Sequence, residues 1–124
     1  MRGILLLAVG EAFGGRAEKL LSAAAAIEMI HASSLILDDL PSMDDALLRR
    51  GQPALHREFG EDLAILSAVA LLNHAYGFVT RAHAECSPRR WPLQQVIDRV
   101  VEAVGWEGTI AGEAVDRHSE ASSL

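Results

Sequence analysis

The chain has little cysteine and few aromatic side chains. Cys86 is its single cysteine, and aromatic residues make up 5% of the 124 positions. A lone cysteine excludes a disulfide framework and fits a reducing compartment, so we expect a cytoplasmic protein in which Cys86 is an inert thiol. Stability must then come from a hydrophobic core. Hydrophobic residues form 50% of the sequence, enough for one domain over residues 1–124.

Positive charge and long apolar runs are also scarce. Eleven Lys and Arg stand against 17 Asp and Glu, a net charge of −6, which argues against a nucleic-acid partner. The run Leu63–Leu72 contains Ser67 and is well short of the about 20 apolar residues of a spanning helix, so no transmembrane segment is expected. The histidines lack the spacing of zinc ligands: His31, His56, His74, His83 and His118.

The patterning that is present predicts an all-α fold. Apolar residues recur at helical spacing, and β-branched residues are isolated within Ala- and Leu-rich stretches, so no sheet is expected. The segment 61–80 is apolar nearly all round, which predicts a buried helix, and Ala23–Ala26 allows close helix contact. The predicted helices cover residues 4–13, 16–37, 61–80, 92–104 and 109–118, with loops at 51–60 and 86–92 and a break at 105–108.

One short stretch concentrates charge of both signs. Asp38-Asp39-Leu40-Pro41-Ser42-Met43-Asp44-Asp45 is followed closely by Arg49-Arg50. Carboxylates suit Mg²⁺, and arginines bind phosphate oxygens through paired N–H donors. Pro41 should end the helix near Asp38 and let Asp44 return beside it. The alternative, a polar last turn of a surface helix, is disfavoured because carboxylates there oppose the helix dipole.

These residues carry a resemblance to a known family. Residues 31–72 resemble the central block of the trans-polyprenyl diphosphate synthases, with Asp38-Asp39-x-x-x-x-Asp44 as their first aspartate-rich motif and Arg49-Arg50-Gly51 as the arginine pair behind it. Leu37, Asp45-Ala46 and Ser67-Ala68-Val69 are most similar to the bacterial geranylgeranyl diphosphate synthases of carotenoid pathways. The resemblance implies a helical isoprenoid-synthase bundle, in truncated form.

The ends of the chain match the family less completely. Arg2-Gly3-Ile4 resembles the end of its Gly-Lys-Arg-x-Arg segment, and Gly112–Asp116 resembles its Gly-Gln-x-x-Asp motif with Glu113 in place of Gln. Family members are more than twice as long, and their second aspartate-rich motif has no counterpart here. The chain therefore resembles the N-terminal half of a synthase, and we expect it not to be competent alone.

The resemblance implies a role for each motif residue. In the family, Mg²⁺ helps an allylic diphosphate to lose its diphosphate, and isopentenyl diphosphate attacks the resulting cation. Asp38 and Asp44 would be metal ligands with Asp39 assisting in catalysis, Arg49 would bind the allylic diphosphate, and Arg50 the isopentenyl diphosphate.

Residues outside the motif have implied roles as well. His31, on the face of Asp38, and Arg2 would also contact isopentenyl diphosphate. Asp116 matches the Asp of the family's Gly-Gln-x-x-Asp motif, which implies a place in the site. The alternative for His31 is a side chain packed near the helix surface, and the alternative for Asp116 is a charge on a helix surface. Ser33 and Ser34 stand where shorter-product relatives often carry an aromatic residue, which favours a geranylgeranyl product.

Three classes of function remain open from the sequence. The chain is a truncated geranylgeranyl diphosphate synthase completed by another chain, a non-catalytic prenyl diphosphate-binding or regulatory subunit of a full-length synthase, or an inactive fragment. The family forms helical dimers, so a homo- or hetero-oligomer is expected. A truncated bundle should also leave an apolar helix face bare, and we expect it to be that of residues 61–80.

Overall fold

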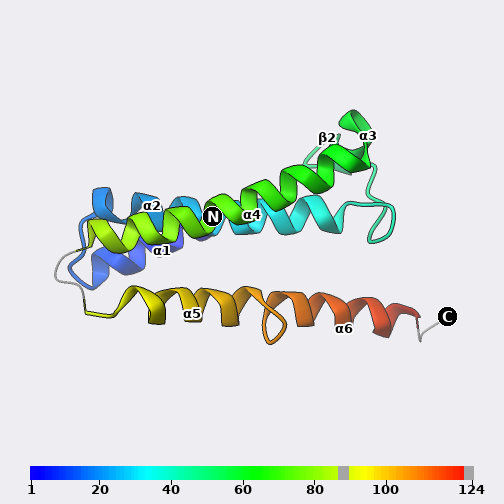
Figure 1. The fold of residues 1–124 in the computed structure, drawn as a ribbon. Coiled ribbons are helices and arrows are strands. Elements are labelled where there is room, and N and C mark those ends of the chain that lie inside the picture. Colours follow the sequence, from blue (N-terminus) through cyan, green and yellow to red (C-terminus); the bar gives the residue numbers. More distant parts are fainter. Residues whose placement is uncertain (87–89, 122–124) are drawn as a thin grey trace. The chain divides into compact units, whose positions relative to one another are not determined.

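The computed structural model describes residues 1–86 and 90–121, with side chains as far as residue 116. Its contacts divide the chain into two compact units, Met1–Ser87 and Pro88–Leu124. The predicted helical fold is confirmed: helices dominate both units, and a minute hairpin is the only sheet in the described ranges (Figure 1).

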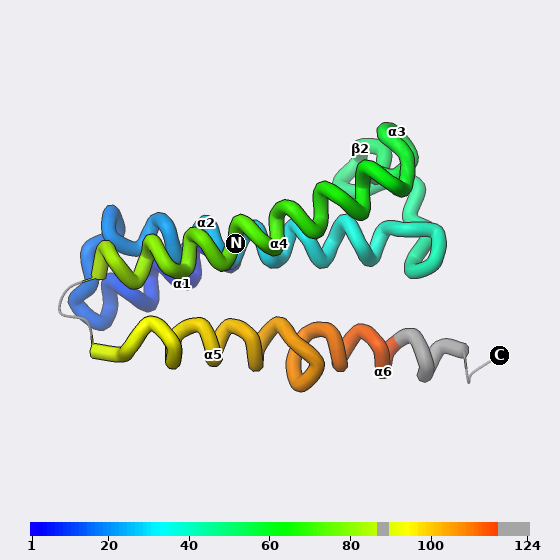
Figure 2. Tube along the Cα trace, viewed as in Figure 1, coloured from blue at the N-terminus to red at the C-terminus, as the bar shows by residue number. Residues whose placement is uncertain are grey.

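The first unit is built on two long helices that lie side by side. Helix α2 spans Ala17–Asp38 and α4 spans Glu61–Glu85, and these two make the most extensive contact in the chain (Figure 2). The contact is lined by small side chains at matching intervals, which lets the two backbones approach closely. These residues are Ser22, Ala26 and Ser33 on α2 and Ala64, Ala68 and Ala75 on α4, all buried. Within the alanine run of the sequence, Ala24 and Ala26 are buried.

Helix α1, Arg2–Ala12, packs against α2. Its buried residue is Gly3, and a Cβ there would come within 3.3 Å of the Ala24 carbonyl oxygen. Small residues on both helices therefore set this contact. Gly14 follows the helix with φ of 82°, a left-handed conformation that glycine adopts without steric cost. It lets the chain reverse direction toward α2.

The segment between α2 and α4 is more ordered than predicted. Strands β1, Leu48–Arg49, and β2, Gln52–Pro53, form an antiparallel hairpin, and α3 spans Leu55–Phe59. The prediction of a plain loop over residues 51–60 was wrong, as was the absence of any strand. Arg50 and Gly51 form the two-residue connection, and both have positive φ, as a type I′ turn requires. Strands this short have no hydrophobic period to detect.

Helix α4 is buried along one narrow face instead of all round. The small residues facing α2 are buried, whereas Leu63, Ile65, Leu66 and Val69 are 42–63% exposed. Full burial was therefore a wrong prediction, and the predicted bare apolar face is confirmed. By length and composition alone, α2 and α4 are apolar enough to cross a membrane. Core helices of water-soluble proteins pass the same test.

The second unit consists of α5, Leu93–Val104, and α6, Thr109–Ala121, which contact each other. The predicted break at residues 105–108 is confirmed, with Gly105 capping α5 through the Val101 carbonyl oxygen at 2.7 Å. The predicted loop over 86–92 lies partly outside the described residues, at 87–89. The expectation for the far end of α6 also lies partly outside them, because side chains beyond residue 116 are not described.

Candidate functional site

The loop after α2 doubles back on itself. Helix α2 ends at Asp38, and Asp39 caps it. Three backbone hydrogen bonds then close the loop: the Asp44 N–H donates to the Asp38 carbonyl at 2.8 Å, Asp45 to Leu40 at 3.0 Å, and Ala46 to Asp39 at 3.2 Å. The backbone of Asp44 therefore lies against the end of α2 beside Asp38, which confirms the return that Pro41 and the motif spacing predicted.

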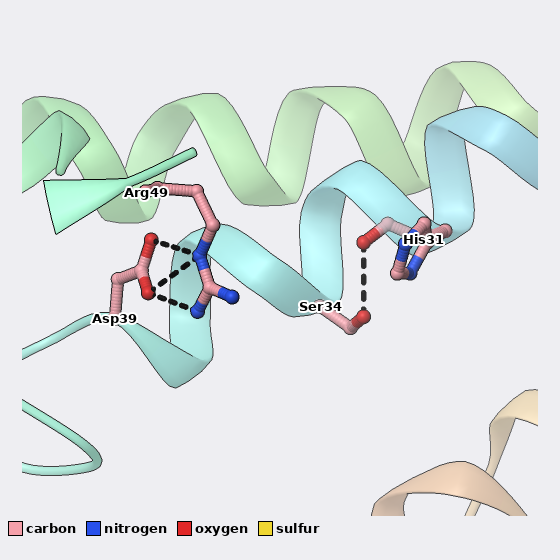
Figure 3. Close-up of polar contacts among 4 residues, drawn as sticks. All are labelled: His31, Ser34, Asp39 and Arg49. Carbon is pink, nitrogen blue, oxygen red and sulfur yellow. Dashed lines mark hydrogen bonds and ion pairs between the residues drawn. The ribbon is translucent and has the colours of Figure 1, made fainter. Parts of the chain in front are cut away.

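Asp39 forms an ion pair that the sequence did not reveal. Arg49 Nε donates to the two carboxylate oxygens of Asp39 at 3.0 and 3.1 Å, and Nη2 donates as well (Figure 3). The Asp39 side chain is 5% exposed, so the pair is well shielded from water on the carboxylate side. The pKa of Arg49 is raised, first by this hydrogen bond, against some desolvation, and then by the charges of Asp39, Asp38 and Asp44.

Asp38 and Asp44 suit a magnesium ion whose remaining ligands are phosphate oxygens and water. Among the described residues, no three His, Cys, Asp or Glu side chains lie close enough to hold a metal by themselves. Asp38 and Asp44 adjoin through their backbones, and Mg²⁺ is commonly held by one or two carboxylates together with substrate phosphates and water. The donor set therefore fits Mg²⁺ that arrives with a diphosphate, and fits a closed structural metal site poorly.

Arg2, at the start of α1, contacts His31 on α2. Arg2 Nη1 and His31 Nε2 are 2.7 Å apart. The pKa of His31 is lowered, first by partial burial and then by the Arg2 charge; Glu28 opposes this, and Arg50 adds to it. Of the three residues predicted to contact isopentenyl diphosphate, Arg2 and His31 are therefore in direct contact.

Glu28 is a neighbour of this pair that the sequence analysis missed. Its Oε1 accepts from the Gly3 N–H at 2.7 Å and from the Met1 ammonium at 3.1 Å, so it caps α1 from the side of α2. These hydrogen bonds lower the Glu28 pKa, the Gly3 N–H contributing most. Its position one helical turn before His31 is the only signal the sequence offers.

The serines predicted to set product length differ in their surroundings. Ser33 is buried, and Ser34 is half-buried with its hydroxyl donating to the His31 carbonyl at 2.9 Å (Figure 3). Both side chains are small, as the prediction assumed; their effect on product length stays a prediction. Asp116 lies on α6 of the second unit, so its role likewise stays a prediction.

Asp45 contacts two residues of α3, which the sequence analysis did not predict. Arg57 Nη2, on α3, donates to Asp45 Oδ1 at 2.6 Å, and His56 Nε2 lies 4.0 Å from the same oxygen. Asp45 has φ of 47°, a left-handed conformation that is uncommon among non-glycine residues, although Asp adopts it more readily than most. The sequence placed Asp45 outside the metal site and gave no reason to connect it with α3.

Similarity to known proteins now defines the class. Residues 1–123 match the polyprenyl synthetase family, and the chain belongs to this family. It is 44% identical over 124 residues to the farnesyl diphosphate synthase of Geobacillus stearothermophilus, covering all of this chain and 41% of that one. It is 42% identical over 126 residues to the large subunit 1 of a heterodimeric geranylgeranyl pyrophosphate synthase of Arabidopsis thaliana, covering 33% of that protein.

A solved structure agrees with this assignment. A farnesyl/geranylfarnesyl diphosphate synthase from Zymomonas mobilis matches with a TM-score of 0.91 and 33% identity, over all of this chain and 44% of that one. The predicted family and its helical bundle are thereby confirmed. The chain spans about a third to two fifths of the length of these curated relatives.

Proposed function

We propose that the chain forms the magnesium- and diphosphate-binding half of a prenyltransferase site that condenses isopentenyl diphosphate with an allylic diphosphate. The observation that supports this most strongly is the doubled-back loop, in which the Asp44 N–H donates to the Asp38 carbonyl oxygen at 2.8 Å. It brings two carboxylates to one end of α2, with Arg49 held nearby by Asp39. The relatives' names refer to the same class of reaction.

The residues near the end of α2 and those around His31 would each bind one of the two substrates. When bound, Mg²⁺ would neutralise the charge that develops on the departing diphosphate. Arg49, already oriented by Asp39, presents guanidinium N–H groups to the allylic diphosphate beside Asp38 and Asp44. Arg2 and Arg50 supply N–H donors and positive charge for the diphosphate of the second substrate, and His31 supplies a further N–H donor.

Calorimetry on the intact chain tests this proposal. With Mg²⁺ present, the non-hydrolysable probe farnesyl thiolodiphosphate is expected to bind, and chelation with EDTA should abolish binding because the carboxylates alone repel the diphosphate. Asp38→Ala should remove binding, whereas Asp98→Ala, at an exposed position on α5, should not. Equal binding with and without chelator would contradict a metal bridge.

A second candidate is a binding or regulatory subunit that pairs with a full-length synthase. It is favoured by the bare face of α4 and by similarity to the large subunit of an enzyme named as heterodimeric. Incorporation of radiolabelled isopentenyl diphosphate separates the two. The synthase proposal expects the chain to restore turnover to a synthase disabled in its own first aspartate-rich motif. The subunit proposal expects altered turnover only with an active synthase.

We further propose a geranylgeranyl product, a carotenoid pathway and a cytoplasmic location. The small side chains of Ser33 and Ser34 and the motif details Leu37 and Asp45-Ala46 support the product and pathway, and the lone cysteine supports the location. Mass spectrometry of the prenyl alcohols from the restored enzyme tests the product. A farnesyl product as the main species would contradict it.

A further inference from the structure

His56 is a buried imidazole with no hydrogen-bond partner. Its side chain is 3% exposed, and neither Nδ1 nor Nε2 makes a hydrogen bond. Buried polar atoms are nearly always paired, because an unpaired one loses its hydration without compensation. An orphaned imidazole in a short helix next to a functional loop therefore calls for an explanation beyond packing.

The polar group facing His56 is the Asp45 carboxylate. Oδ1 lies 4.0 Å from Nε2, too far for a hydrogen bond yet close enough to become one after a small movement of the loop. The same oxygen already accepts from Arg57 Nη2 at 2.6 Å. Two adjacent α3 side chains thus converge on one carboxylate, and they do so where Asp45 adopts φ of 47°.

Asp45 is the residue through which α3 acts on the aspartate-rich loop. It directly follows Asp44, and its N–H donates to the Leu40 carbonyl, next to the bond from Asp44 to Asp38. The left-handed conformation is less favourable for Asp than the right-handed one, so contacts that hold the Asp45 side chain help to keep it there. The hydrogen bond from Arg57 holds the Asp45 side chain in place. Because Asp44 precedes Asp45 directly, this also limits the positions open to the Asp44 carboxylate.

We propose that His56, together with Arg57, is a positioning residue for the metal-binding loop, acting through Asp45. His56 closes the 4.0 Å gap to Asp45 by a small shift of the loop, in the unliganded chain as well as with ligand bound, and contacts neither metal nor substrate itself. Its ring fills the buried space behind the loop and offers one N–H donor toward Asp45. The inference has two parts. The structural half, that His56 holds the loop through Asp45, stands without any metal. The functional half, that this improves Mg²⁺ binding, rests on the proposed magnesium site.

The structural half is tested by hydrogen exchange of single amides in the unliganded chain. His56→Leu keeps much of the volume and removes the donor, and it should speed exchange at Asp44, Asp45 and Ala46 about tenfold, the worth of one hydrogen bond. His56→Gln, which restores a donor near the Nε2 position, should recover most of the protection. His74→Leu, at an exposed histidine of α4, is the matched control and should change none of the three.

The functional half is tested by the apparent Mg²⁺ affinity measured with farnesyl thiolodiphosphate. His56→Leu should weaken it about tenfold, with His56→Gln and His74→Leu close to the unmodified chain. If the unmodified chain does not bind the probe with Mg²⁺, the proposed function fails, and the exchange data still decide the role of His56. Unchanged loop exchange, exchange raised equally along α2 and α4, or unchanged Mg²⁺ affinity in a chain that binds the probe would overturn the positioning role.

Discussion

Charged side chains at this site are arranged so that each carboxylate has a separate task. Asp39 orients Arg49, Glu28 caps α1, and Asp45 is held by Arg57. Asp38 and Asp44 lie together at the end of α2, joined by the Asp44 N–H and the Asp38 carbonyl oxygen, and are the pair proposed to bind a divalent ion. The motif spacing predicts that pair, because a helix ended by Pro41 must reverse within a few residues. It does not predict the partner of Asp39, which depends on the direction in which the β1–β2 hairpin carries Arg49.

The Asp39–Arg49 pair should contribute measurably to stability. Asp39→Asn removes the charge and leaves Arg49 without its bidentate acceptor. We expect the free energy of unfolding to fall by about 2 kcal/mol, less than for a fully buried pair because the Arg49 side chain is 38% exposed. Urea denaturation followed by circular dichroism measures this. Asp98→Asn is the control, and a loss no larger than in that control would show that the pair is not a stabilising contact.

The lowered pKa of His31 is a second consequence at the residue scale. Arg2→Gln removes one of its causes, so the pKa should move back toward the ordinary value of 6.5. Because the folded-state pKa is depressed, His31 favours folding above pH 6.5, and this contribution is lost as pH falls through the folded pKa. The Cε1 proton signal of His31, followed by NMR against pH, measures the shift. Arg16→Gln should leave the titration in place; an unmoved midpoint in Arg2→Gln would refute the coupling.

At the scale of the element, length and packing follow from simple patterns. The boundaries of α2 and the break at residues 105–108 follow from proline and glycine positions. The contact of α2 with α4 follows from small residues at matching intervals. Two features escape such reasoning. The hairpin is too short to show a period, and the exposure of Leu66 and Val69 depends on what lies against α4, which composition does not reveal.

The docking of α1 on α2 should depend on pH through Glu28. The pKa of this carboxyl is lowered from its ordinary 4.5 by the Gly3 N–H and the Met1 ammonium. The stabilisation is therefore present above pH 4.5 and is lost as pH falls through the folded pKa. Glu28→Gln should speed hydrogen exchange in α1 at pH 7, and this difference should shrink at pH 3.

Glu58→Gln, at an exposed residue of α3, provides the control for the same experiment. It should leave α1 exchange unchanged at both pH values. A difference between Glu28→Gln and the unmodified chain that persists undiminished at pH 3 would rule out the charged carboxylate as the group that holds α1.

At the scale of the whole molecule, the bare face of α4 should drive association. Leu66 and Val69 are 63% and 58% exposed, and burying side chains of this kind stabilises by about 1.5–3 kcal/mol each. The chain should therefore self-associate as its concentration rises, and Leu66→Glu should weaken association about tenfold or more. Sedimentation velocity measures this. Val115→Glu on α6 is the matched control, and a chain monomeric at every concentration would contradict the expectation.

The most direct test of the central claim locates the metal. Mn²⁺ in place of Mg²⁺ broadens the NMR signals of nearby amides, and farnesyl thiolodiphosphate supplies the phosphate oxygens. The proposed bridge predicts selective broadening at Asp38, Leu40 and Asp44, only when metal and probe are both present, and its loss in Asp38→Ala. Broadening that needs no probe, or that is equally strong at the acidic start of α4, Glu61 and Asp62, would contradict a diphosphate-bridged ion at the end of α2.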